Sequence, residues 1–137
     1  MSERTIFVFG SNLAGRHGAG SALHAKRQFG AETGVGEGLT GNAYAIPTKD
    51  YHLRVMSLED IAYNAKQFKQ FAREHPTWRF ELVAIGCGLA GYRPEQIAPL
   101  FADAPDNVSQ PPEFTAARPA AAPPAATAPG GEGKALK

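Results

Sequence analysis

The sequence predicts a three-layer α/β fold, with a mostly parallel β-sheet between helices that lie on its two faces. Two observations lead to this prediction. Short apolar runs of strand length alternate with amphipathic segments of helix length, an order typical of parallel sheets. Three glycine clusters stand at or near the ends of predicted strands, and in such sheets ligands bind beyond the carboxyl ends of the strands.

The first predicted strand covers residues 5–9 (TIFVF) and ends at Gly10. An uninterrupted run of β-branched and aromatic residues is typical of a strand that is buried on both faces. A glycine-rich stretch follows it. We expect the next helix over residues 21–30 (SALHAKRQFG), because Ala22 and Phe29 share one face and the last residue is a glycine suited to end a helix.

Residues 31–41 are expected to form a glycine-punctuated loop, and residues 42–46 (NAYAI) a second strand that Pro47 ends. The clearest pattern predicts a helix over residues 58–74, with Ser57 as its N-cap and a proline two residues beyond its end. Its apolar residues recur at helical spacing along one face: Leu58, Ile61, Ala62, Ala65, Phe68 and Ala72.

A third strand is predicted over residues 79–85 (RFELVAI), whose last four residues are continuously apolar, as expected near the centre of a sheet. After a second glycine-rich stretch, Pro94 suits the first position of a helix, and Glu95 suits the positive end of the helix dipole. The composition of residues 107–114 (NVSQPPEF) favours one more strand, at an edge of the sheet.

The composition changes at Thr115, beyond which the chain is rich in Ala, Pro and Gly and has no aromatic residue. Such a segment buries too little apolar surface to offset the entropy lost on ordering it. We therefore expect one domain over residues 1–114 and a disordered tail over residues 115–137.

Charge argues against one class of function. The tail holds three of the 14 Lys and Arg residues and one of the 13 Asp and Glu residues, so 11 cations and 12 anions remain in the predicted domain. Proteins that hold a nucleic-acid backbone normally carry a clear positive excess. We therefore expect no general nucleic-acid binding.

Cys87 is the only cysteine, which excludes an internal disulfide and a multi-cysteine zinc site. No segment approaches the ~18 consecutive apolar residues of a membrane span, and no signal peptide precedes the first strand. His17 and His24 lack the spacing of metal ligands. We expect a cytoplasmic protein without a membrane partner, a metal site or a cofactor.

Two glycine-rich stretches, residues 10–20 (GSNLAGRHGAG) and 85–92 (IGCGLAGY), each follow a predicted strand and precede a predicted helix. The first has the spacing of neither a dinucleotide-binding fingerprint nor a P-loop. Each stretch can be a tight turn that packs a helix against its strand, or a place where main-chain N–H groups approach a phosphate. Together the two could hold a diphosphate from both sides. Cys87 in the second is more typical of a small buried residue than of a nucleophile.

Four segments resemble the macrodomain family, in order and at similar intervals: GAGSALHAKRQFG, NAYAIPTKD, SLEDIAYNAKQFKQFAREH and LVAIGCGLAGYRPEQIAPLF. The resemblance covers about residues 5–104, and its most specific part is AIGCGLAGY leading into a Pro-Glu helix. Within the family, the chain looks most like the small group that removes terminal ADP-ribose from proteins or nucleobases. The opening FVFGSNLAGRHGAG also resembles a widespread class of uncharacterised bacterial and phage proteins.

The resemblance implies a small macrodomain-like fold that binds ADP-ribose, or a related nucleotide diphosphate, between two glycine-rich loops. Asn12 would lie near the ribose, whereas Tyr92 could pack at the edge of the second loop or be an ordinary core aromatic residue. The implied ligand-binding residues are Asn12, Gly18, Ala19, Gly20, Thr48, Gly86, Cys87, Gly88, Leu89, Ala90, Gly91 and Tyr92.

The resemblance also implies a catalytic candidate. In the lysine-using hydrolases of this family, a lysine after the second of these strands attacks the anomeric carbon, and Lys49 matches it. A lysine can do so only when its pKa falls well below ~10.4. Those enzymes also use an aspartate directly after GCGL, where this chain has Ala90. Asp50 could substitute for it, although a solvated loop charge is the commoner role of such a residue.

These residues leave three functions open. The protein could hydrolyse an ADP-ribosyl linkage, or bind ADP-ribose, free or attached to a macromolecule, without turnover. Alternatively, it could be a non-catalytic phage or bacterial interaction protein that keeps the fold without the ligand.

Overall fold

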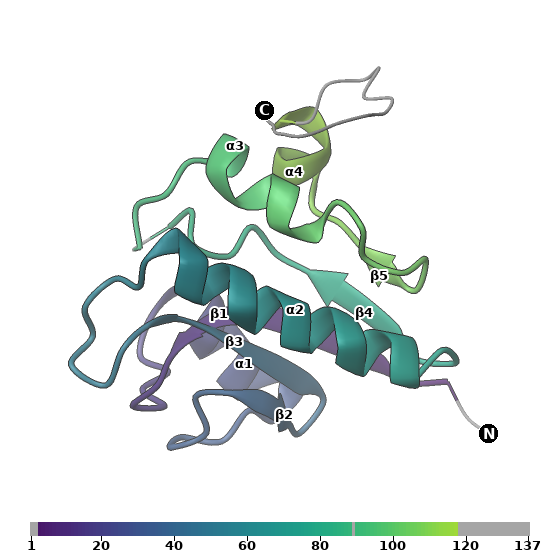
Figure 1. The fold of residues 1–137 in the computed structure, drawn as a ribbon. Helices are drawn as coiled ribbons and strands as arrows, with labels where there is room; N and C mark the ends of the chain where they lie inside the picture. The colour runs from purple at the N-terminus through teal and green to yellow at the C-terminus, as the bar shows by residue number, and fades with distance from the viewer. Residues whose placement is uncertain (1–2, 89, 118–137) are drawn as a thin grey trace.

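One five-stranded sheet forms the middle layer in the computed structural model, which describes residues 3–88 and 90–117 (Figure 1). Its strands are β1 (Thr5–Asn12), β2 (Gly38–Thr40), β3 (Ala43–Lys49), β4 (Arg79–Leu82) and β5 (Val108–Ser109). They lie in the order β2-β3-β1-β4-β5. β2 is antiparallel to β3, and the other pairings of the described strands are parallel. The predicted α/β fold with a mostly parallel sheet is confirmed.

β1 lies at the centre of the sheet and pairs with β3 on one side and β4 on the other. Ile6 and Val8 are buried against one layer of helices, and Phe7 and Phe9 against the other. Because both faces are covered, this strand needs apolar residues at consecutive positions, which explains its uninterrupted apolar sequence.

The helices divide between the two faces of the sheet, as Figure 1 shows with α2 in front of the sheet and α1 behind it. α1 (Gly20–Phe29) packs on one face through Ala22 and Ala25. The opposite face is covered by α2 (Leu58–Glu74), α3 (Pro94–Ile97), the 3₁₀ helix η1 (Ala98–Phe101) and α4 (Pro112–Ala117). The three predicted layers are therefore present.

α2 follows its sequence signals closely. The Ser57 hydroxyl accepts a hydrogen bond from the Asp60 N–H at 3.1 Å, which satisfies a donor of the first helical turn. The ring of Phe68 meets those of Tyr44 and Phe80, with centroids 5.1 and 5.6 Å apart. The buried face of the helix consists of Ile61, Ala65, Phe68 and Ala72.

Four strands differ from the sequence prediction. β1 and β3 run past their expected ends, to Asn12 and Lys49, so the prediction that Pro47 ends its strand is wrong. Pro47 lies opposite Ser11 of β1, beyond Ala45, where the pairing of β3 with β2 ends.

The strand expected over residues 79–85 ends at Leu82, because the Ile85 N–H turns back to the carbonyl of Val83 at 2.7 Å. Gly38–Thr40, expected within a loop, forms the short antiparallel strand β2. The turn after β4 bends the chain toward the glycine-rich stretch that follows.

The prediction of an edge strand over residues 107–114 is mostly wrong. Only Val108–Ser109 pairs with β4, and the two prolines that follow offer no N–H to a ladder. The second proline instead begins α4, in keeping with the preference of proline for the first helical turn. Phe114 of this helix is fully buried and stacks on Phe101 at 5.9 Å.

α4 continues to Ala117, beyond the domain boundary expected after residue 114. The rest of the expected tail, residues 118–137, lies outside the described residues. Of the helices that the structure describes, none has both the length and the apolar character needed to cross a membrane.

Candidate functional site

A cleft with a volume of about 880 Å³ opens at the carboxyl ends of β1, β3 and β4. Its lining residues are Gly10, Ser11, Asn12, Arg16, Gly18, Ala19, Gly20, Ser21, Ala22, Thr48, Lys49, Leu53, Val83, Ala84, Ile85, Gly86, Cys87, Gly88, Ala90, Pro94 and Glu113. Both glycine-rich stretches therefore contribute to one cleft. Of the predicted site residues, Gly91 and Tyr92 lie outside this lining and Leu89 lies outside the described residues, whereas all others belong to it.

The first glycine-rich stretch has two halves with different roles. Gly15 has a φ of +72°, and a Cβ there would overlap the backbone of Gly34. This glycine is needed for a close approach between two chain segments. At Gly18 and Gly20, by contrast, a Cβ would meet nothing within 4 Å, although Gly20 has a φ of +58° that itself favours glycine. Gly15 therefore fits the interpretation as a tight turn, whereas Gly18 and Gly20 belong to main chain that is open to the cleft.

The amino end of α1 faces the cleft without a side-chain cap. Its N-cap residue is Ala19, which makes no capping hydrogen bond, and its first turn contains no acidic residue. N–H groups of a first helical turn have no partner within the helix, and the helix dipole makes this end positive. Arg16 and Lys49 line the same cleft. This arrangement favours an anion.

The second glycine-rich stretch divides in the same way. Gly86 is buried with a φ of +77°, and a Cβ there would lie 3.1 Å from the Ile97 side chain. Gly91 closes a turn by donating its N–H to the carbonyl of Gly88 at 3.0 Å. Gly88 is exposed, and a Cβ there would meet nothing within 4 Å. A Cβ at Gly91 would also meet nothing within 4 Å, but Gly91 does not line the cleft, whereas Gly88 does.

Asn12 and Thr48 line the cleft, but both are also used by the fold. The Asn12 amide accepts from the Arg16 N–H at 3.0 Å and donates to the Arg16 carbonyl at 2.9 Å. Thr48 is buried, and its hydroxyl donates to the carbonyl of Ser11 at 3.3 Å. These bonds shape the floor of the cleft around the ends of β1 and β3.

Lys49 is the last residue of β3 and is half-buried at the cleft. The neighbouring Asp50 is not free to act as a base. Its carboxylate accepts from the N–H groups of His52 and Arg54 at 2.8 and 3.0 Å and from the Arg54 side chain at 3.3 Å. The backbone hydrogen bond from Arg54 is the largest of the effects that lower the pKa of Asp50. Asp50 thus holds the loop after β3.

Cys87 is half-buried and packs against the core on the α2 side of the sheet. Burial raises the pKa of its thiol, and the carboxylates of Glu113 and Glu95 raise it further. A raised pKa keeps the sulfur in its neutral, poorly nucleophilic form. These surroundings favour the structural interpretation of Cys87.

Tyr92 donates its hydroxyl to the carbonyl of Met56 at 2.6 Å and packs against the same core. The core interpretation of this residue fits its position. His17 is also buried, with Nε2 3.1 Å from the carbonyl oxygens of Glu32 and Val35. Within the described ranges, no three His, Cys, Asp or Glu side chains gather in a group that could hold a metal ion.

Two charged residues of the cleft were missed by the sequence reasoning. Arg16 lies inside the first glycine-rich stretch, where a basic residue is itself a signal for an anion site. Glu113 comes from α4, far along the chain, and is the carboxylate of the lining. The signal for its position was the Pro-Pro-Glu sequence, which is typical of a helix start and was interpreted as part of a strand.

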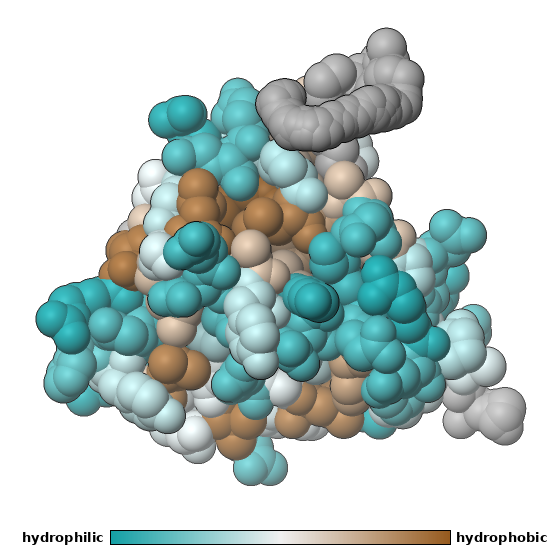
Figure 2. Space-filling view, viewed as in Figure 1, coloured by the Kyte–Doolittle hydropathy of each residue, from teal (hydrophilic) through white to brown (hydrophobic). Residues whose placement is uncertain are grey.

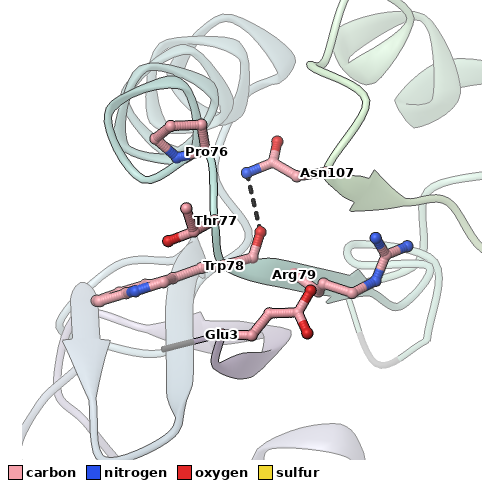
Figure 3. A pocket seen from close by; sticks show the side chains of 6 residues that line it. All are labelled: Glu3, Pro76, Thr77, Trp78, Arg79 and Asn107. Atoms are coloured by element: carbon pink, nitrogen blue, oxygen red, sulfur yellow. Dashed lines mark hydrogen bonds between the residues drawn. The ribbon is translucent and has the colours of Figure 1, made fainter. Parts of the chain in front are cut away.

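Two other hollows lie away from this cleft. A groove of about 630 Å³ runs between α2 and η1, where Figure 2 shows apolar surface above the hydrophilic surface of α2. Lys69 and Asp103 form an ion pair at 2.6 Å in this groove. A smaller pocket of about 310 Å³ lies near the amino end of β4, where Asn107 donates to the carbonyl of Trp78 at 3.1 Å (Figure 3).

Comparison with known proteins supports the fold alone. No protein-family model and no curated protein matches the chain. Among solved structures, it is similar to a protein of unknown function from Bacteroides thetaiotaomicron, with a TM-score of 0.57 and 15% sequence identity. The similarity covers 81% of this chain and 90% of that chain.

Proposed function

We propose that the cleft binds ADP-ribose or a related nucleotide diphosphate, as expected of a macrodomain-like protein. The observation that carries this proposal is the convergence of Gly18, Gly20 and Gly88 on one cleft, each with open space where a side chain would stand. Main chain without side chains lets N–H groups approach phosphate closely.

Charge and size agree with such a ligand. The uncapped amino end of α1, Arg16 and Lys49 offer positive potential at the cleft. Sites for small molecules and cofactors typically have volumes of roughly 300–1,000 Å³, and the cleft volume of about 880 Å³ lies in that range. An ADP-ribosyl group attached to a macromolecule is a candidate ligand as well. A cytoplasmic location belongs to the same proposal.

Hydrolysis of an ADP-ribosyl linkage is a second candidate function, favoured by the position of Lys49 in the cleft. The Lys49 nitrogen would bond to the anomeric carbon as the bond to the leaving group breaks, and water would then release ADP-ribose. Ala90 provides no carboxylate beside this position. Binding without turnover is therefore the primary proposal.

Calorimetry with ADP-ribose tests the binding proposal. A ligand at 100 times its Kd should raise the free energy of unfolding by ~2.7 kcal/mol. No stabilisation by ADP-ribose, NAD or cyclic nucleotides would favour an interaction protein that keeps the fold without the ligand.

Incubation with ADP-ribosylated protein and ADP-ribosylated DNA tests the hydrolase proposal. Release of ADP-ribose by the wild-type protein, lost in Lys49→Ala, would support hydrolysis. Lys66→Ala is a matched control, because Lys66 lies on α2 away from the cleft. Tight binding of ADP-ribose without release would identify a reader of the modification.

A further inference from the structure

The charged side chains of the cleft divide between its two sides. Arg16 follows the central strand β1, and Lys49 ends the neighbouring strand β3. Both cations therefore come from the β1 and β3 part of the sheet. Glu113 comes from α4, which follows the edge strand β5 on the other side of β1 and packs against α3 and η1. The cleft is therefore not uniformly suited to anions.

The backbone at Glu113 is held in place by packing of the neighbouring residue. Phe114 is fully buried and stacks on Phe101, so the backbone of α4 is fixed to η1. α4 also lies beside α3, as Figure 1 shows. Glu113 is an exposed residue of this anchored helix that lines the cleft, and its charge acts on Cys87 in the second glycine-rich stretch.

A carboxylate at this position repels phosphate and accepts hydrogen bonds. A ligand that fills the cleft should therefore place its phosphates near α1 and the two cations, and a hydroxyl or amino group near Glu113. A simple polyphosphate has no such donor to offer at its far end. A diphosphate that ends in a sugar has several.

We infer that Glu113 is a specificity-determining residue, which accepts a hydrogen bond from the sugar of a nucleotide diphosphate sugar and disfavours ligands that end in phosphate. This inference rests on the proposed function of the cleft. It adds to that proposal a distinction between ligands that share a diphosphate but differ beyond it.

Titration calorimetry with ADP-ribose and with ADP tests the inference, because ADP ends in phosphate where ADP-ribose carries a second sugar. Wild-type protein should bind ADP-ribose more tightly than ADP. Glu113→Gln should weaken ADP-ribose binding about tenfold, as expected for loss of a charge-assisted hydrogen bond, and should leave ADP binding equal or tighter. Glu95→Gln is the matched control, because Glu95 also acts on Cys87 but does not line the cleft.

The outcomes separate the two proposals. If wild-type protein binds ADP-ribose but Glu113→Gln changes neither affinity, or weakens both equally, the role of Glu113 is overturned and the binding site stands. If Glu95→Gln has the same effect as Glu113→Gln, the affinity depends only on the net negative charge near the cleft, and the inference is overturned. If wild-type protein binds neither nucleotide, the proposed function fails and this inference fails with it.

Discussion

The two ends of the sheet use their polar groups in opposite ways. In the pocket near the amino end of β4, the Asn107 amide donates to the carbonyls of Ala72, His75 and Trp78 at 3.0–3.1 Å. The Arg4 guanidinium covers the Trp78 ring at 4.4 Å. At the carboxyl end, the first turn of α1 has no side-chain cap and two glycine-rich stretches leave open space.

This difference distinguishes a pocket used by the fold from the cleft for which we propose ligand binding. The Asn107 amide nitrogen already bonds to three carbonyls of the protein, whereas open main chain at the carboxyl edge can bond to something outside the protein. Volume alone does not make the distinction, since both ends are hollowed.

Gly15→Ala should lower the free energy of unfolding by about 3 kcal/mol, because the added Cβ overlaps Gly34 and the φ of +72° disfavours a side chain. Gly18→Ala, three residues along the same stretch, should stay within about 0.5 kcal/mol of wild type. Urea unfolding of the two variants measures both values. Equal losses would contradict the division of this stretch into a packed half and an open half.

Asn107→Ala should lower the free energy of unfolding by about 2 kcal/mol, because it removes the donor shared by three carbonyls between the end of α2 and the start of β4. The affinity for ADP-ribose should not change. Thr77→Ala is a control in the same pocket, where Thr77 is exposed. A large loss of ADP-ribose binding in Asn107→Ala would show that the two ends are not independent.

Gly88→Val should weaken ADP-ribose binding about tenfold or more, because the new side chain occupies space that the ligand would need. Its thermal unfolding should differ little from that of wild type, since a Cβ at this position meets no atom within 4 Å. Titration calorimetry and scanning calorimetry measure the two effects. Unchanged affinity would mean that the second glycine-rich stretch does not hold the ligand.

Cys87 should react slowly with iodoacetamide at pH 8, by a factor of about three or more relative to a free thiol, because burial and two carboxylates raise the pKa of its thiol. The folded state therefore releases this proton at higher pH than the unfolded chain. Cys87 contributes stability below the unfolded pKa and loses it as pH rises through the folded value. A rate at pH 8 equal to that of a free thiol would contradict this environment.

Local patterns were sufficient for much of the fold. Ser57, Pro94 and the buried face of α2 were predicted from local signals, although Ala62 of the predicted apolar face lines the groove beside η1. The positions of the glycine-rich stretches followed from the strands before them. The sequence could not separate Gly15 from Gly18, because the difference depends on Gly34 approaching from another segment.

Glu113 was missed for a related reason. The two prolines before it are compatible with the end of a strand and with the start of a helix, and packing of Phe114 on Phe101 favours the helix. The carboxylate reaches the cleft only because that helix docks beside α3. Conversely, Asp50 was a reasonable candidate by sequence, and its bonds to His52 and Arg54 assign it to its own loop.

The bond from the Tyr92 hydroxyl to the Met56 carbonyl ties the second glycine-rich stretch to the segment after β3, and Met56 is in turn bonded to the carbonyl of Thr48. These hydrogen bonds connect two sides of the cleft in the absence of a ligand. Docking should then require little rearrangement, with backbone shifts below about 1 Å between vacant and occupied forms. The association rate of a ligand should then be limited by diffusional encounter and not by a conformational change of the cleft.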